Sequence, residues 1–103
     1  MPGWKFVTNH ALVLCLIAQQ SRITGREISS TISITEKATR GIISDLEVDG
    51  YVTKRREGRR IRYRINPELP LRHELQQDKA VGSLLEVLGW VRPQRRLKKR
   101  MTD

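Results

Sequence analysis

The residues of this sequence best suited to chemistry are Arg and Lys side chains gathered in two stretches. Residues 54–64 hold seven of them against Glu57, a net of +6, and residues 92–103 hold six against Asp103, a net of +5. The whole chain carries +9, so the remaining residues carry −2. A near-neutral body with two basic appendages is typical of a protein that binds a polyanion such as nucleic acid.

Residues for other chemistries are few. Cys15 is the only cysteine, so no cysteine pair can bind zinc or form an intrachain disulfide, and we expect it to be a small core residue. His10 and His73 lack metal-ligand spacing, and neither a Gly-rich phosphate loop nor a Ser/His/Asp set is identifiable. We therefore expect no catalytic residue, no metal site and no cofactor, and nothing in the sequence indicates a small-molecule effector.

Membrane and export signals are also not recognisable. The longest apolar run, 11–18, has eight residues, whereas a membrane span needs about 18. The first residues show no basic leader followed by an apolar stretch and a cleavage site.

Three helices are predicted in the first half of the chain. The first begins near Thr8 or Asn9 and is apolar on every side from 11 to 18, which is typical of a central core helix. Thr24 and Glu27 have capping-box spacing and begin a second, short helix that ends near Ile32. The third helix is expected from about Glu36 to Asp49 with Gly50 as its left-handed cap, and one short strand at 22–24 remains an option before the second helix.

After Gly50 the pattern alternates with a period of two, which predicts an antiparallel hairpin. We place its strands at 52–56 and 59–65, with Glu57 and Gly58 at the turn. In the second strand one face is apolar, and the other is a row of arginines expected to face water. These two faces are Ile61, Tyr63 and Ile65, and Arg60, Arg62 and Arg64.

The C-terminal part is predicted to be helical, with a short helix near 71–77 and a stronger one near 79–89. The second carries a wide apolar stripe, which we interpret as a homodimer interface, with folding back onto the first helix as the alternative. One domain is expected over 1–90, its dimerisation helix at about 71–89, and a basic disordered tail over 91–103. The interface residues of this prediction are Val81, Leu84, Leu85 and Leu88.

The order helix, helix, short turn, helix, basic hairpin is that of a winged helix-turn-helix. Residues 28–65 (ISSTISITEKATRGIISDLEVDGYVTKRREGRRIRYRI) resemble the wing-containing half of MarR- and ArsR-like bacterial and archaeal transcriptional regulators. The most specific parts are LEVDGYV and GRRIRYRI, and the resemblance covers roughly 4–90. It implies a small single-domain regulator, mainly α with a small β-hairpin (α+β), that acts on double-stranded DNA in a prokaryotic cytoplasm.

Two groups of residues are then predicted to contact DNA. A recognition helix at about 35–49 turns Ala38, Thr39, Ile42 and Leu46 toward the core and a cationic strip toward the major groove. The wing, 52–65, is expected to grip phosphates, with one arginine entering the minor groove. The helix residues are Thr35, Lys37, Arg40, Gly41 and Ser44, and the wing residues are Arg55, Arg56, Arg59, Arg60, Arg62 and Arg64.

Two alternative functions remain open at this point. The arginines of the wing also suit an RNA-binding or nonspecific architectural protein, which differs from a regulator in the ratio of specific to random binding. A winged-helix module for protein interaction would instead need an exposed apolar patch on the recognition helix. A simpler interpretation is also open for each group. The cationic strip of the recognition helix could be an ordinary solvated helix face, and the charges of the hairpin could serve only to keep an edge strand soluble.

Overall fold

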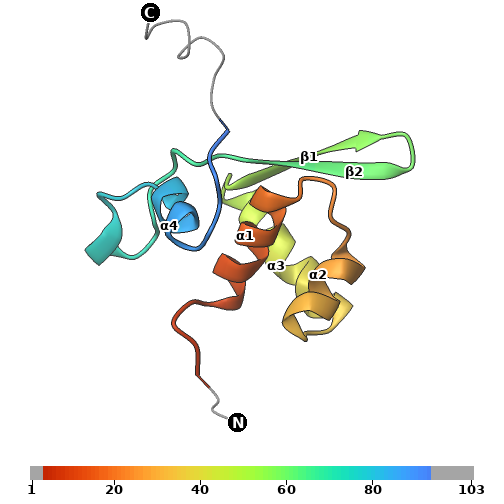
Figure 1. Cartoon of the computed structure of the whole chain (residues 1–103), viewed down its shortest axis with the longest axis horizontal. Helices are drawn as coiled ribbons and strands as arrows, with labels where there is room; N and C mark the ends of the chain where they lie inside the picture. Colours follow the sequence, from red (N-terminus) through yellow and green to blue (C-terminus); the bar gives the residue numbers. More distant parts are fainter. Residues whose placement is uncertain (1–3, 94–103) are drawn as a thin grey trace, which may run out of the picture.

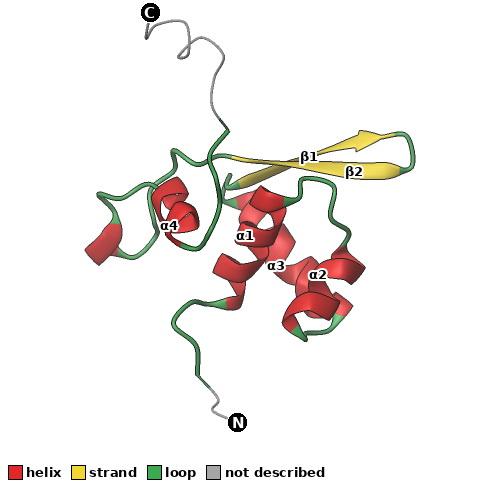
Figure 2. Ribbon diagram, viewed as in Figure 1, coloured by secondary structure: helices red, strands yellow, loops and turns green. Residues whose placement is uncertain are grey.

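The computed structural model describes residues 4–93 and contains helices followed by one antiparallel hairpin (Figures 1 and 2). This confirms the predicted fold class, an α+β winged helix. Residues 94–103, most of the predicted basic tail, lie outside the described part of the chain. The elements are α1 (Asn9–Gln19), α2 (Gly25–Ile32), α3 (Glu36–Val48), β1 (Val52–Glu57), β2 (Arg60–Ile65), a 3-10 helix (Glu74–Gln76) and α4 (Val81–Val87).

The core is built around α1, as its apolar sequence predicts. Helix α1 lies centrally in Figure 1, with α2 on one side and α4 on the other. Val13 and Ile17 of this helix are at most 1% exposed, so it is enclosed by its neighbours. Other elements contribute side chains that are almost fully buried in the same cluster: Ile28 from α2, Leu46 from α3, Val52 from β1 and Leu85 from α4.

Threonine side chains begin the first three helices. The hydroxyl oxygens of Thr8, Thr24 and Thr35 accept hydrogen bonds from backbone N–H groups of the first turn, which otherwise have no partner within a helix. At α2 the carboxylate of Glu27 also accepts the N–H of Thr24, completing the predicted capping box.

Helices α3 and α4 both end at a glycine with a left-handed backbone. After α3, Gly50 has φ of 86°, and the N–H of Tyr51 donates to the carbonyl of Leu46. After α4, Gly89 has φ of 112°, and the N–H of Trp90 donates to the carbonyl of Leu85. This is the Schellman arrangement, in which the residue after the glycine also packs against the last turn of the helix.

The hairpin lies where it was predicted, but its turn is one residue later, at Gly58 and Arg59, and its register runs from Val52 opposite Ile65 to Glu57 opposite Arg60. Gly58, with φ of 64°, makes the tight turn possible. The optional strand at 22–24 is not formed. Instead, β2 forms a backbone hydrogen bond with the connection between α1 and α2, from the N–H of Tyr63 to the carbonyl of Ser21 at 2.8 Å.

The prediction of a helix at 71–77 is wrong, except for the single 3-10 turn. Residues 69–71 are extended and pair with residues 79–81: the N–H of Leu71 donates to Lys79, and the N–H of Val81 donates to Leu69. These bonds use backbone groups that a longer helix would need. Leu75 is consequently 77% exposed and does not extend an apolar stripe.

Helix α4 is shorter than predicted and belongs to the core of its own chain. Val81 is 5% exposed and Leu85 is fully buried, so neither is available to a partner, and the alternative of packing on α1 describes them better. Leu84 and Leu88 are half-buried. Gly82 lets the start of α4 lie close to Pro67, since a Cβ on residue 82 would lie 2.7 Å from Cβ of Pro67.

Arg92 falls within the predicted tail, 91–103, but contacts the domain. Its guanidinium donates to the carboxylate of Glu86 at 2.8 Å and lies over the ring of Trp90, 5.1 Å from the centroid. The described domain therefore extends to at least Arg92. None of the helices within 4–93 is long and apolar enough to cross a membrane.

Candidate nucleic-acid interface

The outer face of α3 carries the predicted polar strip. Lys37, Arg40, Gly41 and Ser44 are all exposed, whereas Thr39, Ile42, Ile43 and Leu46 are buried. Ala38, in the first turn of α3, was expected on the core side but is exposed. The strip is therefore slightly wider than the sequence suggests.

Gly41 has no packing role within the chain. A Cβ at this position would meet no atom within 4 Å. A glycine in a helix interior costs about 1 kcal/mol relative to alanine, and nothing inside the protein offsets this cost. The interpretation that Gly41 lets the helix backbone approach a groove wall stays a prediction.

Thr35 has a structural task in addition to its predicted contact. Its hydroxyl oxygen accepts the N–H of Ala38 at 2.9 Å and so caps α3. The hydroxyl proton remains free to donate to a phosphate or base edge. A replacement at Thr35 therefore changes helix stability together with any contact to DNA.

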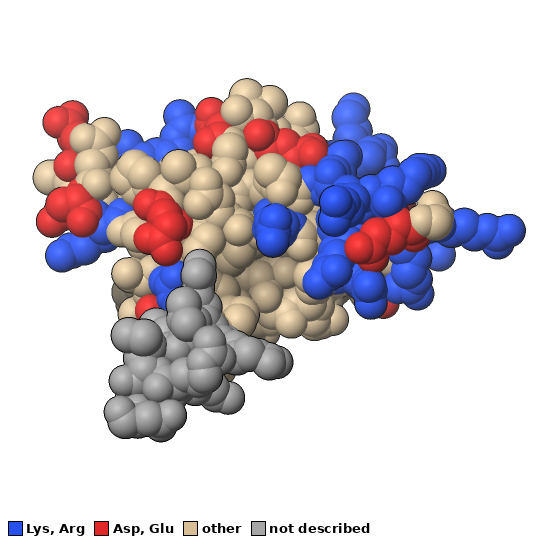
Figure 3. All heavy atoms as spheres, turned by 90° about the horizontal axis from the view of Figure 1, so that it is seen from above, with Lys and Arg blue, Asp and Glu red and all other residues tan. Residues whose placement is uncertain are grey.

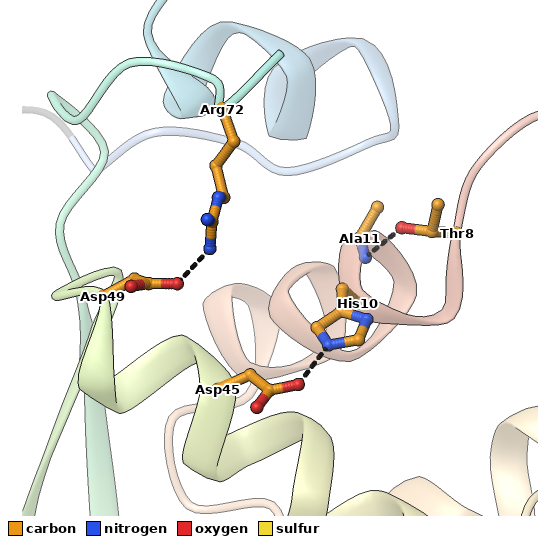
Figure 4. Close-up of polar contacts among 6 residues, drawn as sticks. All are labelled: Thr8, His10, Ala11, Asp45, Asp49 and Arg72. Carbon is orange, nitrogen blue, oxygen red and sulfur yellow. Dashed lines mark hydrogen bonds and ion pairs between the residues drawn. The ribbon is translucent and has the colours of Figure 1, made fainter.

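Two side-chain contacts join the back of α3 to distant parts of the chain (Figure 4). Nε2 of His10, on α1, lies 2.8 Å from Oδ2 of Asp45. Arg72, in the loop after β2, pairs with Asp49 at the end of α3. Sequence reasoning missed both pairs, because the partners are 35 and 23 residues apart and follow no periodic pattern.

A hollow of about 550 Å³ lies where α2, α3 and β1 meet. Arg40 and Ser44 of the recognition strip line it together with Lys54 of β1, which pairs with Glu47 at 3.6 Å. Arg26, at the start of α2, lines the same hollow and was not predicted. The fold thus brings part of the helix strip and part of the hairpin to one surface, while Thr35 and Lys37 lie outside this hollow.

The register of the hairpin defines its arginine face. Arg55 lies opposite Arg62, and Arg60 lies opposite Glu57. Since paired residues share a face, we define the ladder face as Arg55, Glu57, Arg60, Arg62 and Arg64. Arg56 pairs with Ile61 and is therefore on the other face of the hairpin, where its side chain is also exposed. Arg59 lies in the turn.

The basic side chains form one large group at the hairpin end of the molecule (Figure 3). Directly opposed like charges such as Arg55 and Arg62 destabilise a hairpin unless an anion lies near them. The ladder face is therefore a surface on which bound phosphate would relieve repulsion.

Acidic atoms are visible inside this basic group in Figure 3. The carboxylate of Glu57 accepts a hydrogen bond from Arg22 at 3.0 Å and pairs with Arg62 at 3.5 Å. The hydrogen bond from Arg22 holds the pKa of Glu57 below its usual value, so this side chain is negatively charged at neutral pH.

The remaining candidate ligands have local structural roles. Cys15 is buried, which raises the pKa of its thiol, and its sulfur accepts from Gln19 at 3.3 Å. Nδ1 of His73 accepts the N–H of Leu75 and caps the 3-10 turn. Over the described residues, no group of three or more His, Cys, Asp or Glu side chains is placed to hold a metal ion.

Three helices followed by a two-stranded hairpin, with a helix-turn-helix at α2–α3, define a winged-helix fold. A solved structure with this fold is reduced HlyU from Vibrio cholerae N16961. The two chains are 21% identical, the TM-score is 0.55, and the match covers 80% of this chain and 74% of HlyU. No protein-family model matches the sequence, and no curated protein is significantly similar to it.

Proposed function

We propose that this protein is a transcriptional regulator that binds double-stranded DNA at specific sequences. In this proposal α3 lies in the major groove, and the hairpin contacts phosphates and the adjacent minor groove. The proposal is supported by the winged-helix fold and by the resemblance of the sequence to MarR- and ArsR-like regulators.

One observation carries the proposal most directly. Arg40 and Ser44 of α3 share a hollow with Lys54 of β1, so the exposed strip of α3 meets a basic residue of the hairpin on one surface. A duplex laid on that surface meets donors suited to base edges and cations suited to the backbone at the same time. The residues that line this hollow include no exposed apolar side chain of the kind that a protein-interaction module would need.

Selection of bound duplexes from a random library tests the proposal. Enrichment of one motif is expected, with much weaker binding to random DNA of the same length. Retention of all duplexes alike, or tighter binding of RNA, would favour an architectural or RNA-binding protein instead.

Replacing Arg64 with alanine is expected to weaken binding to the selected duplex and to random duplex by the same factor. Arg64 is on the ladder face, and a phosphate contact carries no sequence information. The slope of log Kd against log salt concentration should fall by about one unit. Fluorescence anisotropy titrations at several salt concentrations measure both quantities. Loss confined to the selected duplex would show that Arg64 reads a base.

We also propose that the regulator is a homodimer, because two recognition helices read two half-sites about one helical turn apart. Its interface must differ from the predicted stripe, since Val81 and Leu85 lie in the core. Val87 and Val91 are 82% and 84% exposed; Val87 is on α4, three residues after the half-buried Leu84, and Val91 follows the end of the helix. An apolar surface of this kind typically marks an interaction site.

Replacing both Val87 and Val91 with glutamate is expected to convert the dimer into a folded monomer. Charge on an interface core opposes association, while exposed positions tolerate it within a single chain. Sedimentation at micromolar concentration reports the mass, and circular dichroism reports the fold. A wild-type chain that sediments as a monomer, or a double variant that remains dimeric, would contradict this interface.

A further inference from the structure

We propose that Arg22 and Arg62 form a binding pair for one DNA backbone phosphate, and that Glu57 occupies this pair in the free protein as an internal substitute for the phosphate. The inference rests on the proposed function, since the ligand is the backbone of a duplex. It adds a contact residue from outside the hairpin and recognition helix, and it assigns the acidic residue of the ladder face a role in controlling affinity.

The geometry of the three side chains resembles that of a bound phosphate. Oε1 of Glu57 accepts from Nη2 of Arg22 at 3.0 Å, and Oε2 lies 3.5 Å from Nη1 of Arg62. The two carboxylate oxygens therefore each face a different guanidinium group. A phosphate presents its two non-bridging oxygens to paired arginines in the same way and has a comparable charge.

All three side chains are within reach of a ligand. The side chains of Arg22, Arg62 and Glu57 are 57%, 53% and 31% exposed. An incoming phosphate can thus displace the carboxylate without any change in the core. Exposed ion pairs of this kind are weak, so a duplex held nearby by α3 can compete with them.

Arg22 does not depend on Glu57 for its position beside the hairpin. The neighbouring residue, Ser21, accepts the N–H of Tyr63 at 2.8 Å, which fixes the connection between α1 and α2 against β2. Removal of the carboxylate charge therefore leaves the backbone that carries Arg22 and Arg62 in place, with both guanidinium groups free to bind an anion. This distinguishes a phosphate substitute from a side chain that merely fastens the hairpin to the helices.

An internal substitute lowers the affinity for every duplex that uses this pair of arginines. A backbone phosphate of random or selected duplex must displace the same Glu57 carboxylate, so the competition weakens both complexes. A selected duplex is positioned by base contacts and presents its phosphate at a high effective concentration, so it displaces the carboxylate completely. Glu57 therefore sets the strength of a phosphate contact that carries no sequence information.

Glu57→Gln in the full chain tests this inference, with Glu74→Gln as the matched control. Both replacements remove one negative charge, but Glu74 lies on the 3-10 helix, away from the hairpin (Figure 1). We expect Glu57→Gln to tighten binding to a random 20-base-pair duplex about fivefold and to steepen the salt slope by about one unit, against less than about twofold for Glu74→Gln. Binding to the selected duplex should tighten by at least the same factor, because its phosphate displaces the same carboxylate.

A second background makes the result specific to the arginine pair. When Arg22 and Arg62 are both alanine, Glu57→Gln should have no more effect than Glu74→Gln. Thermal unfolding of each variant checks that the fold is retained. Equal effects of Glu57→Gln and Glu74→Gln in the wild-type chain, or weaker binding after Glu57→Gln, would overturn the inference while leaving the proposed function intact. A wild-type chain that binds no duplex even at low salt would overturn both.

Discussion

Replacing Arg40 with alanine is expected to weaken binding to the selected duplex by about 1–3 kcal/mol and to random duplex much less. Arg40 is exposed on the outer face of α3 and lines the hollow that α3 shares with β1. A guanidinium in this position can donate two hydrogen bonds to a guanine edge, and nothing replaces them when the side chain is removed. Anisotropy titrations with the two duplexes give the difference in free energy.

Lys79→Ala is the control, because it removes the same unit of charge from an exposed side chain at the other end of the molecule. It should change neither affinity by more than a few tenths of a kcal/mol. Equal losses on selected and random duplex after Arg40→Ala would show that α3 does not read bases, and the assignment of the recognition helix would then be wrong.

Replacing Leu85 with alanine is expected to lower the free energy of unfolding by about 2–5 kcal/mol. Leu85 is fully buried in the cluster around α1, and Trp90 packs in the same cluster. Small domains have only about 5–15 kcal/mol of stability, so this single change removes a large share of it. Urea unfolding followed by circular dichroism measures the effect.

Val87→Ala is the matched change on the same helix, at a side chain that is 82% exposed. It should alter the unfolding free energy by no more than about 0.5 kcal/mol at a concentration where the protein is monomeric. If both variants were equally stable, α4 would not contribute to the core, and its apolar residues would again be candidates for a partner surface.

Local sequence patterns predicted most of the fold. Capping residues such as Thr24, the glycine after α3 and the alternation in β2 each act over a few residues, and the structure confirms them. The exposed strip on α3 also follows from helical periodicity alone.

Contacts between distant residues were not predictable in this way. An apolar stripe on α4 is the same whether it packs on α1 or on a second copy, so periodicity did not reveal that Leu85 is in the core. The helix predicted at 71–77 failed because the backbone of Leu71 bonds to Lys79 instead. The contact of Arg22 with Glu57 spans 35 residues and depends on the register and the loop together.

The packing of α4 against α1 has a consequence for synthesis of the protein. Helix α1 emerges from the ribosome early, whereas Leu85 and Trp90, which complete the cluster around it, are made about 70 residues later. At the 5–20 residues per second of translation, the apolar surface of α1 stays uncovered for several seconds. The side of α1 that packs on α4 is therefore exposed on the nascent chain during that interval, and a ribosome that stalls within the hairpin holds an α1 that cannot be fully covered.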